Sequence, residues 1–300
     1  MSGNFTMSFW ADFDDILEAS APLAPLTTFG IGGPAEHLAR PRTLSELGRM
    51  LTCADQEGIP VRLLGAGSNL LVADEGVGGL VVKLAGREFS RLEMLPGAVS
   101  CGAGLSLGRL VREAAEAGLS GLEGLAGIPA SVGGALRMNA GGRYGSIGAV
   151  TREVRCTDGE GNEVALKRDE VDFGYRQSSL AGLVVTGCTL ELTPEAPETV
   201  RKRTREVIEE KKRMQPLGEK SAGCVFRNPR ADLPAGRLLD DLGFKGARAG
   251  GAEVSGVHAN YIVNTGAASC ADVLELVDRM REGARREKGV DLELELEIWS

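Results

Sequence analysis

The sequence has little histidine and no closely spaced cysteines. Only two of its 300 residues are histidine, and its six cysteines lie far apart without a C-x-x-C pair. Zinc centres are built from such cysteine pairs and histidines, so no metal site is expected. Scattered cysteines without a disulfide framework are typical of a reducing compartment. We therefore expect a cytoplasmic protein.

Long apolar runs and an excess of basic charge are also missing. No run reaches the roughly 18 apolar residues of a membrane span, and residues 1–20 lack the basic segment of a secretory signal. The formal net charge is −8, whereas a general nucleic-acid surface needs clustered basic charge. These absences predict no membrane span and no nucleic-acid partner.

Glycine is abundant instead. The chain has 42 glycines, about twice the average share, and nine of the 28 residues from Gly121 to Gly148 are glycine. Linkers are rich in serine and charge, whereas this segment carries several apolar residues. It is therefore either a buried tight turn or a backbone that approaches a ligand closely.

The chain is long and apolar enough for two or three domains, with 43% hydrophobic residues. Apolar spacing predicts helices at 43–58, 107–117, 235–242 and 270–287, and strands at 61–64, 79–84, 90–94, 98–101, 150–157, 163–166, 183–192 and 291–299. Strands and helices do not alternate regularly, so the pattern favours an α+β fold over a doubly wound sheet. A boundary is predicted near residue 195, where two prolines precede a charged helix of roughly 15 residues.

Two shorter glycine loops follow predicted strands. LGAGSNLLV (Leu64–Val72) places G-x-G before Ser68 and Asn69, whose side chains can donate to phosphate oxygens. The loop lacks the third glycine of a dinucleotide fingerprint, and an ordinary strand-end turn fits it equally well. Gly102 and Gly104 form the second loop. Three glycine loops together favour one long, phosphate-bearing ligand.

Three further segments carry candidate chemistry. In SAGCVFRNP, Cys224 is either a buried structural cysteine or a thiol in an electropositive pocket. In DFGYRQSSL, Arg176 is either a surface ion-pair partner or a fixed cation facing an anion. The C-terminal DLELELEIW alternates with period two, which places Glu293, Glu295 and Glu297 on one face without choosing among them.

Five motifs together carry a family resemblance. In chain order they are TTFGIGGPAEHL (residues 27–38), LGAGSNLL, IPASVGGALRMNAG, DFGYRQS and SAGCVFRNP. As a set they resemble the UDP-N-acetylenolpyruvoylglucosamine reductases, in the shorter type II form, over nearly the whole chain. The resemblance implies a two-part FAD-binding domain of the vanillyl-alcohol oxidase (PCMH) type and a C-terminal α+β substrate domain. We expect an N-terminal extension at 1–20, FAD-binding subdomains at 21–85 and 86–195, and the substrate domain at 196–300.

The same resemblance implies an activity. NADPH would reduce a noncovalently bound FAD, which would pass hydride to UDP-N-acetylglucosamine enolpyruvate and yield UDP-N-acetylmuramate for peptidoglycan synthesis. The implied FAD-binding residues are Gly65, Ala66, Gly67, Ser68, Asn69 and Leu70 at the pyrophosphate, and Ile128, Pro129, Gly133 and Gly134 along the flavin. The alternatives are another flavin-dependent oxidase or dehydrogenase of the same fold, and a non-catalytic nucleotide-sugar-binding protein.

Three catalytic residues follow from the resemblance. Arg176, at the arginine of the YRxS motif, would stabilise the enolate-like charge that hydride transfer leaves on the substrate. Cys224, where many members have serine, would deliver the proton; a thiol with an unperturbed pKa of about 8.5 is the stronger acid. The family's final glutamate falls on Glu295, because GVDLELEL matches GVxLExEV. Substrate contacts are implied for Tyr175, Asn228 and His258.

Three positions depart from the family's pattern. Gly30 stands where a basic residue is usual, so an anion contact there is lost or moved. Ala130 replaces a glycine, and a positive φ at this position would be strained. NAGGRYG is one residue longer than the usual NAGAYG, which adds Arg143 and shifts Tyr144.

Overall fold

The computed structural model describes residues 13–158 and 161–300, and the chain forms two compact units. Among the described residues, the first unit contains residues 13–21, 35–65 and those between 78 and 201. The second contains residues 22–34, 66–77 and 202–300. Each unit is therefore assembled from three separate segments of the chain.

A four-stranded sheet in the first unit has the order β1-β2-β5-β3. Its strands are β1 (Leu17–Pro22), β2 (Pro34–Ala39), β5 (Val77–Val82) and β3 (Val61–Leu63). Helix α1 (Leu44–Gln56) buries Leu47, Met50 and Leu51 in a core shared with Leu80 and Val82. The apolar spacing of this helix, three and four residues apart, is what predicted it.

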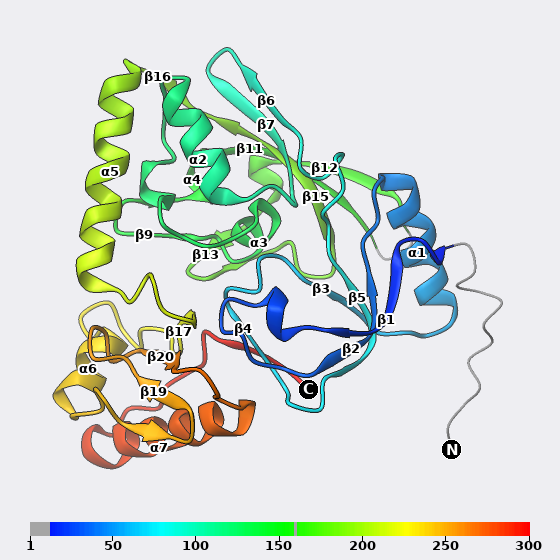
Figure 1. The fold of residues 1–300 in the computed structure, drawn as a ribbon. Helices are drawn as coiled ribbons and strands as arrows, with labels where there is room; N and C mark the ends of the chain where they lie inside the picture. The colour runs from blue at the N-terminus through cyan, green and yellow to red at the C-terminus, as the bar shows by residue number, and fades with distance from the viewer. Residues whose placement is uncertain (1–12, 159–160) are drawn as a thin grey trace. The chain divides into compact units, whose positions relative to one another are not determined.

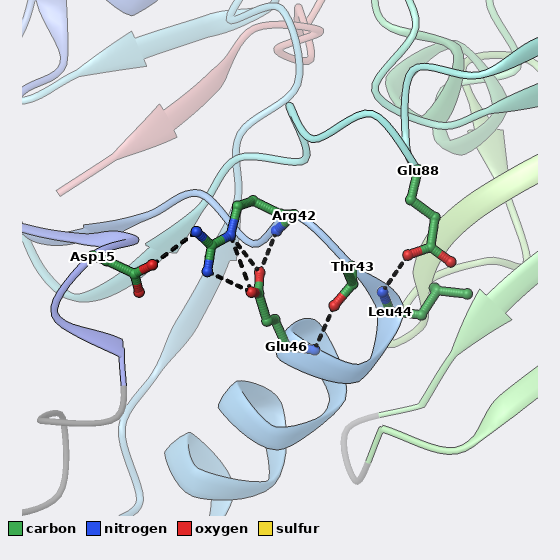
Figure 2. Close-up of polar contacts among 6 residues, drawn as sticks. All are labelled: Asp15, Arg42, Thr43, Leu44, Glu46 and Glu88. Carbon is green, nitrogen blue, oxygen red and sulfur yellow. Dashed lines mark hydrogen bonds and ion pairs between the residues drawn. The ribbon is translucent and has the colours of Figure 1, made fainter.

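The start of α1 is fixed by side chains that bind its first backbone groups (Figure 2). Thr43 Oγ1 accepts from the Glu46 N–H at 3.1 Å, and Glu88 accepts from the Leu44 N–H at 2.9 Å. Glu46 binds the backbone N–H and the guanidinium of Arg42, and this hydrogen bonding lowers the pKa of Glu46. Helix termini leave such N–H groups without intrahelical partners, so these contacts define the helix start.

A five-stranded antiparallel sheet in the same unit has the order β12-β11-β15-β7-β6 (Figure 1). Its strands are β6 (Leu92–Leu95), β7 (Ala98–Gly102), β11 (Thr151–Thr157), β12 (Glu163–Lys167) and β15 (Val184–Glu191). The strands predicted at 150–157 and 163–166 are confirmed and form the antiparallel pair β11 and β12. Gly159, between them, lies outside the described residues. The guanidinium of Arg155 donates to the Cys101 and Cys188 carbonyls, both at 3.2 Å, and so links three neighbouring strands.

Short elements connect these strands. They are β8 (Leu119–Ser120), β9 (Gly141–Gly142), β10 (Gly145–Ser146), β13 (Phe173–Gly174), β14 (Gln177–Ser178) and β16 (Thr193–Pro194), with the helices α2 (Leu107–Glu116), α3 (Val132–Arg137) and α4 (Ile147–Val150). Helix α2 confirms the prediction for residues 107–117, and α3 lies in the glycine-rich segment. Helix α5 (Pro197–Met214) contains the boundary between the two units.

The second unit has a four-stranded antiparallel sheet with the order β17-β20-β19-β18. Its strands are β17 (Ser221–Cys224), β18 (Arg248–Ala249), β19 (Ala252–Val254) and β20 (Tyr261–Asn264), and its helices are α6 (Ala235–Asp241) and α7 (Cys270–Lys288). The predicted helices at 235–242 and 270–287 are thus confirmed. Helix α7 buries Leu276 and Met280 in the core of this unit. Asp74 caps α7 by accepting from the Cys270 and Ala271 N–H groups at 2.8 and 3.3 Å.

The continuous strand predicted for residues 291–299 is wrong. Only β21 (Glu297–Trp299) is a strand there, and it pairs in parallel with β4 (Leu70–Val72). Leu294 forms an isolated bridge with Phe226. The chain bends between these two pairings, where the N–H groups of Glu295 and Leu296 both donate to the Val225 carbonyl.

Candidate active site

The loop after β3 contributes to both units, and its two parts have different contacts. In the first unit, a Cβ on Gly65 would lie 2.7 Å from Ser131 Oγ, and the Gly65 carbonyl accepts from the Lys83 ammonium at 2.6 Å. In the second unit, Gly67 has φ +62°, and its carbonyl accepts from the Thr28 N–H at 3.1 Å. Gly67 is required by its positive φ and by the backbone of Leu26, 2.5 Å from such a Cβ, whereas a Cβ on Gly65 would displace the Ser131 hydroxyl.

The Asn69 amide contacts the C-terminal segment of the second unit. Its Nδ2 donates to the Glu295 carbonyl at 2.8 Å, and its own carbonyl accepts from the Glu297 N–H at 3.0 Å. The Asn69 amide therefore attaches the loop to the C-terminal segment of the same unit. Next to it, Ser68 and Ala66 are partly exposed and Leu70 is buried at the start of β4.

Cys224 lies at the end of β17, opposite Tyr261 of β20. It is partly exposed, whereas four of the other five cysteines are buried. Burial raises the pKa values of Cys156 and Cys270 to about 11. The partial exposure of Cys224 does not fit the interpretation of a buried structural cysteine.

Glu295 is brought to the strand of Cys224 by backbone hydrogen bonds. Its N–H donates to the carbonyl of Val225, the residue after Cys224, at 2.9 Å. Its carbonyl accepts from Asn69, so both backbone groups of this residue are fixed. The segment that carries the glutamate thus runs beside the segment that carries the thiol, within one unit.

Asn260 is a positioning residue that the sequence analysis did not find. Its side chain is only 2% exposed and binds both backbone groups of Phe226, accepting from the N–H at 3.0 Å and donating to the carbonyl at 2.8 Å. Its own carbonyl accepts from the Val225 N–H at 2.9 Å. Asn260 therefore fixes the two residues that follow Cys224. The only signal in the sequence is an asparagine directly before an apolar strand.

Asn228 and His258 make contacts that fix the backbone of the second unit. Asn228 Oδ1 accepts from the Ala235 N–H at 3.0 Å, at the start of α6. His258 Nδ1 accepts from the Asn260 N–H at 3.2 Å, and its ring lies edge-on to Tyr261 with centroids 5.0 Å apart. Burial, and then the positive charge of Lys245, lower the pKa of His258. Both the burial and the hydrogen bond, in which Nδ1 is the acceptor, favour the neutral form of this ring.

Arg176 occupies the two-residue turn between β13 and β14 in the first unit. It has φ +57°, a left-handed conformation that is rare for a residue other than glycine. Its Nη1 donates to the Gly141 carbonyl at 2.7 Å. The neighbouring Tyr175 is 54% exposed, and the guanidinium lies 5.5 Å from its ring centroid. Backbone strain of this kind is concentrated at functional positions.

The glycine-rich segment is packed largely against the chain itself. A Cβ on Gly124 would lie 2.5 Å from the Tyr144 carbonyl oxygen, and one on Gly133 would lie 3.0 Å from Ala103 Cβ. The Gly133 and Gly134 N–H groups donate to the Ala103 carbonyl and to Ser131 Oγ. Close packing within the protein is thus sufficient to require glycine at several of these positions. Ile128 remains partly exposed and Pro129 exposed beside them.

The structure shows the surroundings of the three positions that depart from the family pattern. Gly30 has φ +68°, and a Cβ there would lie 3.7 Å from the ammonium of Lys220, so a cation from another segment lies beside this position. Ala130 is not among the residues with positive φ, so no strain of that kind arises. The added Arg143 donates to the Tyr144 hydroxyl and lies 4.6 Å from the centroid of its ring.

Comparisons with known proteins show the family of the chain. Residues 35–167 match a model of an FAD-binding domain, and residues 215–299 match the C-terminal domain of UDP-N-acetylenolpyruvoylglucosamine reductase. The reductase of Moorella thermoacetica is 47% identical over 93% of this chain and 91% of its own length. A second reductase, from Symbiobacterium thermophilum, is 41% identical over 94% of this chain and 92% of its own length. The chain belongs to the UDP-N-acetylenolpyruvoylglucosamine reductase family.

A solved structure of the family supports the same assignment. The crystal structure of the reductase from Thermus caldophilus superposes with a TM-score of 0.83, at 44% identity over 95% of this chain and 98% of the other. The predicted α+β fold, an FAD-binding domain with the C-terminal domain of the reductases, is thereby confirmed. Among residues 13–158 and 161–300, no helix could cross a membrane and no cluster of three potential metal ligands is found.

The residues of this reductase family member fit a flavin dinucleotide. The left-handed Gly67 turns the loop backbone, and the Lys83 ammonium beside Gly65 supplies positive charge suited to a diphosphate. Ile128 and Pro129 present apolar surface that is not fully buried, which suits a flat ring system. The sequence analysis missed Lys83, because a single lysine at the end of an apolar strand gives no motif.

Proposed function

We propose that this chain is the NADPH-dependent reductase that converts UDP-N-acetylglucosamine enolpyruvate to UDP-N-acetylmuramate, in the type II form of the family. Family membership makes it an oxidoreductase of peptidoglycan precursor synthesis. One observation carries the assignment of the chemistry: a partly exposed thiol, Cys224, and a partly buried glutamate, Glu295, lie on neighbouring segments joined through the Val225 carbonyl.

FAD would be held by Gly65–Leu70 at its diphosphate and by Ile128, Pro129, Gly133 and Gly134 along the flavin. When bound, it would accept hydride from NADPH and pass it to the vinyl carbon of the substrate. Because Asn69 already binds the Glu295 carbonyl, its side chain would act by positioning the loop. The backbone of the loop, and Ser68, would contact the diphosphate.

Arg176 would stabilise the negative charge that develops on the substrate carboxylate and its neighbouring carbon. A guanidinium is always charged and forms two parallel hydrogen bonds to a carboxylate. The bond from Nη1 to the Gly141 carbonyl orients the group. Tyr175, next to it and exposed, would contact the substrate.

Cys224 would then deliver a proton to the substrate carbon next to the carboxylate, and Glu295 would orient the thiol or the enol. A thiol is a much stronger acid than a serine hydroxyl and still holds its proton at neutral pH. Asn228 and His258 would contact the substrate or position the groups that do. Their bonds to the Ala235 and Asn260 N–H groups support a positioning contribution from both side chains.

The test begins with the purified protein. We expect visible flavin absorption and NADPH oxidation that depends on UDP-N-acetylglucosamine enolpyruvate. Colourless protein, or oxygen consumption without that substrate, would contradict the proposal; the second result would favour another flavin-dependent oxidase.

Two variants at one position test the proton donor. Cys224→Ala should retain flavin reduction by NADPH while losing formation of UDP-N-acetylmuramate, because only the proton donor is removed. Cys224→Ser is the matched control and should keep part of the activity, since serine serves at this position in many relatives. Loss of flavin binding in Cys224→Ala would show a structural cysteine instead.

A further inference from the structure

Lys83 has a position that the proposed chemistry does not yet use. It follows directly after β5, and its backbone N–H donates to the Ala39 carbonyl at 2.9 Å. Its side chain extends to the first glycine of the loop after β3, where Nζ donates to the Gly65 carbonyl at 2.6 Å. Both residues belong to the first unit, and the lysine is partly buried.

The charge of this ammonium is not balanced within the described part of the chain. Burial lowers the pKa of Lys83, and the positive charge of Arg40 lowers it further. Arg40 forms its own ion pair with Glu18, at 2.8 Å. None of the ion pairs among residues 13–158 and 161–300 includes Lys83. A desolvated ammonium without a counter-ion is unfavourable, so a bound anion would stabilise this arrangement.

Holding the Gly65 carbonyl in place does not by itself explain why the residue is a lysine. Any uncharged donor of suitable length could bind the Gly65 carbonyl without the cost of a partly buried charge. An ammonium has three N–H donors, and the carbonyl uses one of them. The remaining two are available on a group that lies against a loop expected to bind phosphate. Lysine commonly binds phosphate as a compact positive charge.

We propose that Lys83 binds the diphosphate of a ligand at the Gly65 loop. The inference rests on the proposed function, in which both FAD and the UDP-linked substrate carry a diphosphate. The assignment of the loop to FAD favours the cofactor as the source. The ammonium would bind directly to phosphate oxygens while it keeps the Gly65 carbonyl in place.

The experiment compares two ligands that differ in phosphate. Apoprotein is titrated with FAD and with riboflavin, which has the flavin ring but no phosphate. Lys83→Gln removes the charge and keeps an N–H donor, and Lys167→Gln removes the charge of an exposed lysine of the same unit as a control. We expect Lys83→Gln to weaken FAD binding by about 10- to 100-fold and to leave riboflavin affinity within about 2-fold. The control should change neither affinity.

The possible outcomes separate the roles. If Lys83→Gln weakens the binding of FAD and of riboflavin equally, or abolishes the binding of both, the lysine is structural and the proposal is overturned. If FAD affinity is unchanged while the FAD-saturated variant has a raised KM for the UDP-linked substrate, the proposal holds with the substrate as the source of the diphosphate. If neither quantity changes, the proposal fails. Turnover by the wild-type enzyme tests the proposed function separately, because it does not depend on any of these results.

Discussion

Asn260 offers a sharp test of how the segment after Cys224 is positioned. Its buried amide binds the N–H and the carbonyl of Phe226, at 3.0 and 2.8 Å. In Asn260→Asp the shape is kept. A protonated carboxyl can still accept from the N–H and donate to the carbonyl, whereas a carboxylate can only accept. The ionised form would place a negative charge against the Phe226 carbonyl oxygen.

The size of the effect follows from the burial of this side chain, which is 2% exposed. Full burial raises a carboxyl pKa by about 3 units or more, from about 3.9 in the unfolded chain to about 7 in the folded protein. A group with a raised pKa in the folded state contributes full stability below its unfolded pKa and loses it as the pH rises. Each unit corresponds to about 1.4 kcal/mol. Between about pH 5 and about pH 8, we expect the free energy of unfolding of Asn260→Asp to fall by about 3 kcal/mol relative to that of the wild type.

Urea unfolding measures this difference. In a Trp10→Phe background, the fluorescence of the buried Trp299 reports on the second unit alone. Asn260→Ala is the matched control: it loses both hydrogen bonds, about 2 to 5 kcal/mol, with no added pH dependence. An equal loss for Asn260→Asp at both pH values would refute a buried carboxyl at this position. A loss below about 0.5 kcal/mol for Asn260→Ala would refute the importance of the two bonds.

Other outcomes follow from the capping, burial and protonation of named groups. His258→Gln should reduce the acid sensitivity of the second unit: burial lowers the pKa of His258 below 6.5, so its contribution is full above that value and is lost as the pH falls through the lowered pKa. Parallel stability–pH curves for wild type and variant would contradict this. Asp74→Ala should lower the free energy of unfolding by about 1 to 2 kcal/mol, because α7 loses its cap. Glu75→Ala, at the exposed neighbouring position, should lower it by less than about 0.5 kcal/mol. In apoprotein at neutral pH, a maleimide should label Cys224 before Cys156 and Cys270, whose pKa values are raised to about 11; peptide mass spectrometry showing the reverse order would contradict the exposure of Cys224.

The fold was predictable from the sequence wherever local signals decide it. Helix α1 has its cap, Thr43, and its apolar spacing within 14 residues, and both were visible. The prediction of one continuous strand at residues 291–299 was wrong because the bend in this segment depends on the Val225 carbonyl, about 70 residues earlier in the chain. Alternation of apolar and polar residues identifies faces, but it does not show where a distant carbonyl takes two successive N–H groups.

The candidate site was predictable only to the extent that its residues form motifs. Cys224 and Arg176 lie in such motifs, whereas Asn260 and Lys83 were found only through their hydrogen bonds to carbonyl groups elsewhere in the sequence. The strain expected at Ala130 is absent: its carbonyl accepts from the Leu107 N–H at 2.9 Å, and its φ is not positive. Substitution patterns do not reveal such backbone contacts.

The structure adds a physical argument to the choice among three glutamates that alternation leaves equivalent. Glu293 and Glu297 are exposed, and Glu297 accepts from the Trp299 indole N–H at 2.9 Å. Glu295 is partly buried, and its two backbone groups bind Val225 and Asn69. A carboxylate that must orient a proton donor needs a fixed backbone. Of the three, only Glu295 is partly buried, and its backbone N–H binds the residue that follows Cys224.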